Sequence, residues 1–336
     1  MRLPMNISIC ITVLNEEGSL GKLLDSLLVQ TKKADEIVIV DGGSNDKTVE
    51  IIKHYQKKDR SIKLLKEKCS RARGRNLAVE MARNEVIAMT DAGCVARRDW
   101  LEKITEPLFH LGGAKAHPRG VRMDFSEAEV RSTPRGCTGG VDVVAGFYKM
   151  VYKNSLGKAA RMFLGVLPGS FDADFLPSTR SVAFRKAVWE EVGGFPEKQV
   201  DTAEDTVFNF KLLRQGKKIS RVKDAIVEWG MPGSIYEVGR KIYEYARGDA
   251  KTKIFFFPGK GLASHNIKAI FVILRYLLGL ILLILGISQP VLLVILVILF
   301  LLYLFRAFRK AGLWGIILQI ISDIAVMSGF ASGLLE

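Results

Sequence analysis

Residues 36–48 read Glu-Ile-Val-Ile-Val-Asp-Gly-Gly-Ser-Asn-Asp-Lys-Thr, an apolar run that stops at an acid and a pair of glycines. The run 37–40 is too short for a helix and lacks polar alternation, which is typical of a parallel strand covered on both faces. Asp41 then lies at the carboxyl end of a strand, where a carboxylate can bind a base or a ribose. A plain turn is the alternative, because the glycines permit unusual backbone angles and Ser44 or Asn45 can cap the following helix.

The flanking sequence alternates between strand and helix patterns. Strands are predicted at 7–13, 37–40, 62–65 and 86–89, and helices at 20–29, 48–55 and 73–82. This alternation predicts a doubly wound α/β domain. No glycine-spaced dinucleotide fingerprint follows the first strand, which argues against a hydride-transfer enzyme.

The charge balance restricts the partners. The 336 residues carry a net charge of +14, which suits anionic lipid or a diphosphate substrate. No RNA-binding aromatic motif appears, so no nucleic-acid partner is expected. Four cysteines show no paired spacing and are expected to be reduced thiols. No apolar signal segment opens the chain, and we expect the catalytic part in the cytoplasm.

The C-terminal region is apolar enough to enter a membrane. Residues 276–305 carry no charge, and one helix of that length would measure about 45 Å, against about 30 Å for the hydrocarbon core. Two helices with a turn at 286–290 fit better, and 313–335 is a third candidate. Flanking basic residues would lie in the cytoplasm, and three spans would turn the C-terminus outward. Asp323 would then lie within the third helix, where a functional role, burial between helices or a shallow helix would each explain it.

The chain therefore divides into three expected parts. These are a catalytic domain (1–230), an amphipathic juxtamembrane segment (231–266) and a membrane domain with about three transmembrane helices (267–336). The stretches 147–167 and 235–257 mix aromatic and basic residues. We expect both to lie along the membrane, with two ordinary amphipathic helices on the core as the alternative.

Three further motifs have the residue types of a transfer site. A second apolar strand runs into Asp91, which either begins a turn or ligates a magnesium or manganese ion on a diphosphate. Residues 71–76 open a helix with three arginines, which attracts phosphate or forms a solvated face. Glu204 and Asp205 open another helix, which the helix dipole alone explains, unless Asp205 is a general base.

The order of these motifs resembles the family 2 glycosyltransferases of GT-A fold, over nearly all of residues 6–250. The resemblance rests on Thr12 with Asn15 and Glu16, on 40–48, on Arg75-Asn76, on Thr90-Asp91, on Gly193-Gly194-Phe195 and on Glu204-Asp205. It implies a GT-A-type doubly wound mixed sheet followed by transmembrane helices. It also implies a donor-nucleotide site made of Thr12, Asn15, Glu16, Asp41, Arg75 and Asn76. Asp91 would hold Mg²⁺ or Mn²⁺, Asp205 would be the base of an inverting transfer, and Glu204 would position the base or the acceptor.

Two departures refine this expectation. Gly93 stands where the family's metal motif has a second acid, so Asp91 would need the diphosphate as co-ligand. The Gln-x-x-Arg-Trp motif of processive synthases is absent, and 240–249 stands in its place. Single-sugar transfer is therefore expected, with Arg180 and Arg247 contacting the acceptor.

The sequence thus predicts an integral membrane glycosyltransferase with a cytoplasmic catalytic domain. It would move one sugar from a nucleotide-diphosphate sugar to a lipid-linked or glycan acceptor, with membrane lipid as a further partner. One alternative is a polyprenyl-phosphate sugar synthase, whose ionised acceptor needs no base and whose lipid phosphate would bind at 147–167. A non-catalytic nucleotide-sugar sensor is the other, motivated by Gly93.

Overall fold

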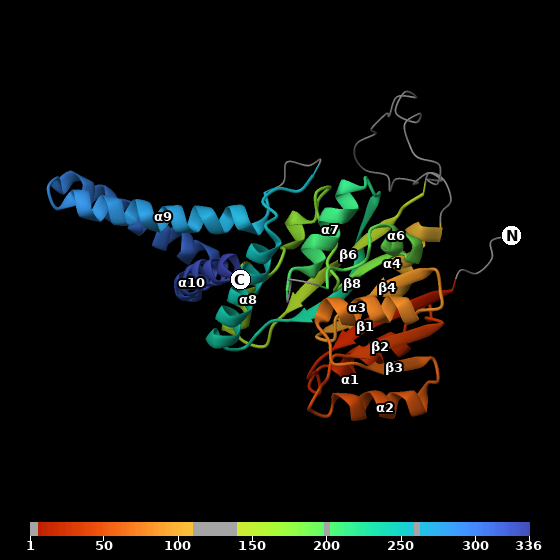
Figure 1. Ribbon diagram of the computed structural model, residues 1–336. Coiled ribbons are helices and arrows are strands. Elements are labelled where there is room, and N and C mark those ends of the chain that lie inside the picture. Colours follow the sequence, from red (N-terminus) through yellow and green to blue (C-terminus); the bar gives the residue numbers. More distant parts are fainter. Residues whose placement is uncertain (1–5, 110–139, 198–201, 259–262) are drawn as a thin grey trace, which may run out of the picture.

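The structure is a computed structural model that describes residues 6–109, 140–197, 202–258 and 263–336. Figure 1 shows an α/β domain from which a pair of long helices projects. The described part of the domain has a sheet with the strand order β3-β2-β1-β4-β7-β6-β8-β5. Cys10, Cys69 and Cys94 are free thiols, whereas Cys137 lies outside the described residues.

The sheet is mixed. Its parallel half consists of β1 (Ile7–Val13), β2 (Glu36–Asp41), β3 (Ile62–Lys66) and β4 (Val86–Met89). Its other half consists of β7 (Val182–Arg185), β6 (Val143–Val151), β8 (Ile219–Gly230) and β5 (Cys94–Ala96). Strand β7 runs antiparallel to β4 and β6, β8 runs parallel to β6, and β5 runs antiparallel to β8. The predicted mixed α/β sheet is confirmed.

Helices cover both faces because successive residues of β1 point to opposite sides. Ile7, Ile9 and Ile11 join one core cluster and Cys10 joins another. The first cluster includes α1 (Leu20–Leu28), α2 (Thr48–Lys58) and α4 (Trp100–Phe109). The second includes α3 (Arg71–Met81), α6 (Lys186–Glu191) and α7 (Glu204–Arg214).

The strand register gathers the predicted motifs at one edge. Val13 pairs with Asp41, and Cys10 pairs with Met89, so β1, β2 and β4 end on the same side. Helix α3 reaches this edge because Gly74 has no side chain. A Cβ there would lie 2.5 Å from Thr12 Cγ2.

The expectation for 147–167 is wrong in its first part. Phe147 and Tyr148 belong to β6 and are buried in the core, so their aromatic rings face the protein and not lipid. Helix α5 (Ser155–Leu164) begins after the strand, capped by Asn154, and a short 3₁₀ helix, η2 (Pro168–Ser170), follows it.

Helix α8 (Ile235–Thr252) is amphipathic, as predicted for 235–257, and one of its faces is covered by the C-terminal part of the chain. A Cβ on Gly329 would lie 2.4 Å from Tyr243 O, and one on Gly333 would lie 2.3 Å from Arg247 O. These two glycines therefore allow the backbones of the two helices to touch.

Helices α9 (His265–Gly286) and α10 (Pro290–Leu335) are long and apolar enough to cross a membrane. The predicted turn at 286–290 is confirmed. Helix α10 is broken at Ala311 and Gly312, where φ is −158° and 64°, so 313–335 forms a separate helical piece.

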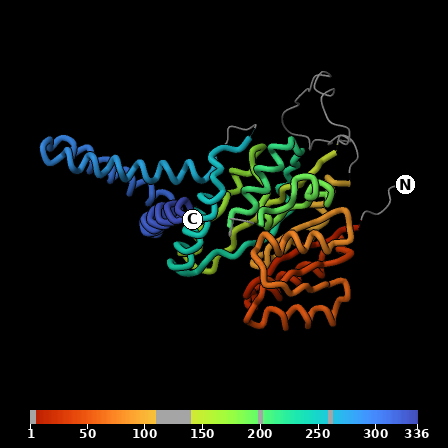
Figure 2. The backbone as a smooth tube through the Cα atoms, viewed as in Figure 1, coloured from red at the N-terminus to blue at the C-terminus, as the bar shows by residue number. Residues whose placement is uncertain are grey.

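The third piece returns to the catalytic domain, and Figure 2 shows the C-terminus beside α8. Glu336 contacts Arg247 Nη2 at 2.5 Å and Lys251 Nζ at 2.6 Å. The expectation of an outward-facing C-terminus is therefore wrong, because these ion pairs hold it to a helix of the catalytic side.

Asp323 is buried between the helices, which was one of the three explanations left open. It is 2% exposed and accepts hydrogen bonds from Arg275 (2.5 Å), Tyr276 (3.0 Å), Tyr303 (2.7 Å) and Gln319 (3.0 Å). Its carboxylate thereby joins α9 to both pieces of α10.

Candidate active site

Arg75 occupies the centre of the site. Helix α3 begins after Ser70, whose hydroxyl accepts a hydrogen bond from Arg73 N. One turn later Arg75, 3% exposed, donates to Asp91 Oδ1 at 2.9 Å and to Glu204 Oε1. A single guanidinium thus joins the acid beyond β4 to the first turn of α7.

The two acids of α7 differ in their surroundings. Glu204 is 4% exposed, and within the described residues its Oε2 has no hydrogen-bond partner. Asp205 Oδ1 accepts from Thr206 N at 2.9 Å. Burial and the adjacent charge of Glu204 raise the pKa of Asp205 to about 6, although Arg75 acts in the opposite direction. A carboxyl group with a pKa this close to neutral can both take up and release a proton at pH 7.

Asp91 remains an anion. Burial alone would raise its pKa, but the charges of Arg75 and Arg180 hold the pKa of Asp91 below its usual value. About a third of its side chain (32%) is exposed, so one carboxylate is open to a ligand.

The surroundings of Asp91 fit a metal ion whose other ligands come partly from the substrate. No group of three or more acid, histidine or cysteine side chains that could hold a metal ion occurs in the part of the chain that the structure describes. A Cβ on Gly93 would meet nothing within 4 Å, so the missing second acid leaves open space. Mg²⁺ and Mn²⁺ accept a single protein carboxylate when diphosphate oxygens and water complete the shell. Asp91 is such a carboxylate.

The ends of β1 and β2 form the expected nucleotide side. Asp41 is 1% exposed, and both its oxygens lie 3.2 Å from Ser44 N. Asn15, with a φ of 54°, accepts from Asn45 N at 2.9 Å, and Glu16 N donates to Thr48 Oγ1 at 2.7 Å. These bonds tie the two strand ends together.

Thr12 lies beneath them. Among the described residues its buried hydroxyl oxygen has no hydrogen-bond partner. The structure therefore brings Thr12, Asn15, Glu16 and Asp41 to one place, and their contact with a donor nucleotide stays a prediction.

Asn76 has a different role from the predicted one. Its Nδ2 donates to Phe195 O (2.9 Å) and Glu197 Oε1 (2.7 Å), and its Oδ1 accepts from Phe195 N (2.9 Å) and Trp189 Nε1 (3.2 Å). The amide is 5% exposed and fully engaged. It fixes the turn at Gly193 and Gly194, whose φ values are 71° and 57°, and it is unavailable to a nucleotide.

The two predicted acceptor arginines also separate. Arg247 donates to both carboxylate oxygens of Glu336, at 2.8 and 2.5 Å, and so anchors the C-terminus. Arg180 lies in the site, 3.9 Å from the Trp229 ring centre and 3.0 Å from Tyr245 Oη. Within the described residues the buried Nε of Arg180 has no hydrogen-bond partner.

Several site residues were not found from the sequence. Trp229 is the second-last residue of β8, and Lys241 of α8 lies 5.4 Å from the centre of its ring. Asp249 of α8 lies 3.4 Å from Thr206 Oγ1. The sequence signal that could have pointed to Lys241 and Asp249 was the run 240–249, which stands in place of the processive motif. The sequence alone could not say which face of α8 packs against α7.

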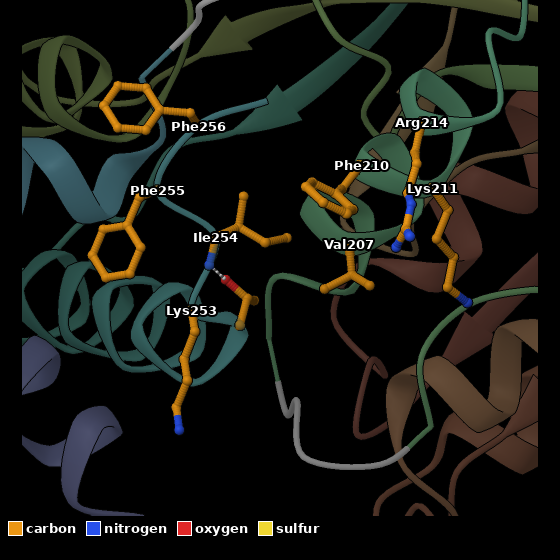
Figure 3. A pocket seen from close by; sticks show the side chains of 9 residues that line it. Val207, Phe210, Lys211, Arg214, Lys253, Ile254, Phe255 and Phe256 are labelled. Atoms are coloured by element: carbon orange, nitrogen blue, oxygen red, sulfur yellow. Dashed lines mark hydrogen bonds between the residues drawn. The ribbon is translucent and has the colours of Figure 1, made fainter. Parts of the chain in front are cut away.

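An open groove lies beside the site. Its volume is about 460 Å³. Figure 3 shows the lining, which is formed from α7 by Val207, Phe210, Lys211 and Arg214 and from the end of α8 and the chain after it by 252–256. At about 100° per residue, these α7 residues face away from Asp205. The groove is therefore separate from the acids.

The sheet is covered by helices on both faces, and the loops at its strand ends are of the kind that binds nucleotides. Two acids also lie on opposite sides of one arginine. Together these features define the class of nucleotide-dependent group-transfer proteins. The model of the family described as "Glycosyl transferase family 2" matches residues 8–154. The model described as "Glycosyl transferase family group 2" matches residues 119–309, more than half of the chain. The chain belongs to the family 2 glycosyltransferases, and the predicted enzyme class is confirmed.

Individual relatives agree with this assignment. The chain is 23% identical over 273 residues to the "Uncharacterized glycosyltransferase EpsJ" of Bacillus subtilis, covering 77% of this chain and 71% of the relative. It is 28% identical over 198 residues to "Glycosyltransferase AglE" of Haloferax volcanii, covering 56% of each. The match thus spans little more than half of the second relative.

A solved structure supports the fold. The mannosyltransferase PcManGT from Pyrobaculum calidifontis, in complex with GDP-Man and Mn²⁺, superimposes with a TM-score of 0.60 at 18% identity. The match covers 96% of this chain and 87% of that chain. At this identity the likeness concerns the fold, and the predicted GT-A architecture is confirmed.

Proposed function

We propose that this glycosyltransferase is inverting and moves a single sugar from a nucleotide-diphosphate sugar to a lipid-linked or glycan acceptor at the cytoplasmic membrane face. The observation that carries the proposal is the contact of Arg75 with both Asp91 and Glu204. It sets the metal-competent carboxylate of Asp91 on one side of a cation and, on the other, Glu204, the residue next to the proposed base Asp205.

In the proposed reaction Asp205 takes the proton of the acceptor hydroxyl. The acceptor oxygen forms a bond to the anomeric carbon as the bond from that carbon to the diphosphate breaks on the opposite side, which inverts the configuration. Glu204, whose Oε2 has no hydrogen-bond partner in the described residues, orients the acceptor. Arg75 holds Asp91 and Glu204 at fixed positions throughout.

The donor would lie across the strand ends, with Thr12, Asn15, Glu16 and Asp41 toward its nucleoside. Asp91 would hold Mg²⁺ or Mn²⁺ together with the diphosphate, and the ion would neutralise charge on the leaving group. The complex of PcManGT with GDP-Man and Mn²⁺ supports a nucleotide-sugar donor and a divalent ion.

The proposal keeps the division into a catalytic domain (1–230), a juxtamembrane segment (231–266) and a membrane domain (267–336). It places two transmembrane helices in the membrane domain in place of three. Helix α9 and residues 290–310 would cross, because each is one unbroken helix with a long apolar stretch. Residues 313–335 would lie between lipid and α8, since Glu336 binds α8. The catalytic domain would then face the cytoplasm with the basic ends of both crossing helices.

The test is release of nucleoside diphosphate by the full chain in detergent. UDP-, GDP- and dTDP-sugars are offered with Mn²⁺, with and without a total lipid extract. Asp205→Asn should lower turnover by about 10² to 10⁴ and leave nucleotide binding near wild type, because only the base is removed. Asp224→Asn, an exposed acid of β8, is the matched control. Wild-type turnover in Asp205→Asn would exclude the base role, and binding without turnover would favour the sensor.

A second candidate, a polyprenyl-phosphate sugar synthase, is favoured by one observation. Arg180 and Lys241 both lie against Trp229, which places two cations where an acceptor phosphate could bind. Such an acceptor arrives ionised and needs no base. Undecaprenyl phosphate would then support turnover, Asp205→Asn would impair it little, and Lys241→Met would raise the KM for that lipid.

A further inference from the structure

Asp249 connects the helix of the base to the first long apolar helix. It lies in α8 and is 5% exposed. Its Oδ1 lies 3.4 Å from the hydroxyl oxygen of Thr206, the residue after Asp205. Its Oδ2 lies 3.0 Å from Nδ1 of His265, the first residue of α9. Three helices thus meet at one carboxylate.

The start of α9 is built around this carboxylate. Ser264 caps α9 by accepting from Asn266 N at 3.1 Å, and its hydroxyl donates to Ile254 O at 2.5 Å. Asn266, 1% exposed, donates to the backbone oxygen of Asp249 at 2.7 Å and to Ile254 O at 2.9 Å. Both the main chain and the side chain of Asp249 are therefore held by the first residues of α9.

Helix α8 also touches the chain just before the base. A Cβ on Gly248 would lie 2.0 Å from Thr202 Oγ1 and 2.7 Å from Thr202 O. The Thr202 hydroxyl in turn donates to Glu244 O at 2.7 Å. With contacts at Thr202 and Thr206, α8 flanks Asp205 on both sides along the sequence.

The position of Asp249 affects the ionisation of Asp205, because Asp249 is one of the charges around it. Asp205 faces the negative charges of Glu204 and Asp249 and the positive charges of Arg75 and Arg180. His265 faces Asp249, Lys268 and Asp205. A second carboxylate held at a fixed place disfavours ionisation of Asp205 and keeps it a stronger base.

We propose that Asp249 is a positioning residue for Asp205, and that His265 and Asn266 fix Asp249, so that the seating of α9 sets the geometry of the base. The inference rests on the proposed function, in which Asp205 is the base. It assigns to the start of α9 a part in positioning the base, beyond anchoring the chain in the membrane.

The first test needs no substrate. Hydrogen exchange is followed by mass spectrometry in the peptide 202–210 of the full chain in detergent, for Thr206→Val, Thr206→Ser and Asp249→Ala. Thr206→Val and Asp249→Ala should speed exchange in this peptide by about tenfold, because the first turn of α7 loses its tie to α8. Thr206→Ser should restore the wild-type rate. Glu244→Gln, an acid of α8 paired with Arg240, should change nothing. Unchanged exchange in Thr206→Val and Asp249→Ala would overturn the proposal.

The second test is kinetic and uses the donor found by diphosphate release. The isosteric Asp249→Asn should lower kcat by about tenfold, a fraction of a full general-base contribution, with the donor KM within about twofold. Removing a like charge lowers the pKa of Asp205, so the acid limb of the rate profile should move to lower pH by about half a unit or more. A merely structural Asp249 would lower the amount of folded protein and leave the limb in place, and that result would overturn the proposal.

The two proposals can fail separately. Full turnover in Asp205→Asn removes the base and hence the proposed function. An inactive Asp205→Asn together with a wild-type rate profile in Asp249→Asn removes only the role of Asp249.

Discussion

Asp205, the proposed base, should be a source of instability at neutral pH, and Asp205→Asn should therefore make the protein more stable as it loses turnover. Folding raises the pKa of Asp205 from 3.8 to about 6. One pKa unit corresponds to about 1.4 kcal/mol, so ionisation of Asp205 at pH 8 costs about 3 kcal/mol of folding free energy. Asparagine avoids this cost, and its Oδ1 can still accept from Thr206 N, as Asp205 Oδ1 does at 2.9 Å.

The sign of the pH dependence follows from the raised pKa. Wild type keeps the favourable contribution of the neutral carboxyl below pH 3.8 and loses it as pH rises toward 6. The advantage of Asp205→Asn should thus be about 3 kcal/mol at pH 8 and about 1 kcal/mol at pH 4.5. Tryptophan-fluorescence melting in detergent at both pH values measures it, with Asp224→Asn as the control. Equal stability at pH 8, or a gain that does not shrink at pH 4.5, would refute the reasoning.

Three further changes test separate parts of the structure. Gly93→Asp should tighten Mn²⁺-dependent donor binding by about tenfold, since the new Cβ meets open space and a second carboxylate joins that of Asp91. Calorimetry with the nucleoside diphosphate measures the affinity, and an unchanged value would argue against a metal at Asp91. Gly248→Ala should destabilise the protein by about 1–3 kcal/mol through overlap with Thr202, and a wild-type melting temperature would contradict the close contact. Arg247→Ala should loosen the attachment of Glu336, which keeps its ion pair with Lys251, and should speed proteolysis at the C-terminus with the acceptor KM unchanged; a raised acceptor KM would return Arg247 to the acceptor site.

Local patterns predicted the nucleotide half of the sheet well. The strand Val86–Met89 has the predicted bounds, and β1 does as well. Helix α3 begins at Arg71, where the motif 71–76 predicted a helix start, two residues before the bound of 73 given by the alternation, and Ser70 caps it. Alternation and strand length are local properties, and parallel strands end at a shared edge, so the meeting of Asp41 with the end of β1 could be predicted.

Contacts between distant residues could not be predicted in this way. Asn76 was assigned to the donor by the family resemblance, yet its amide is used by Phe195 and Glu197, over a hundred residues away. Arg247 was assigned to the acceptor because of its motif position, yet it binds Glu336. In both cases the residue type indicated that the side chain has a polar partner. Which partner it has depends on how the helices pack, and a hydrophobic pattern does not encode that.

The most direct measurement is the pH profile of nucleoside diphosphate release, from pH 5 to 8, for wild type and Asp205→Asn with matched donor binding. Wild-type kcat/KM should fall about tenfold per pH unit below about pH 6, the pKa of Asp205, and the variant should be slow at every pH without that limb. A wild-type profile that stays flat to pH 5, together with full turnover in Asp205→Asn, would contradict the assignment of the base.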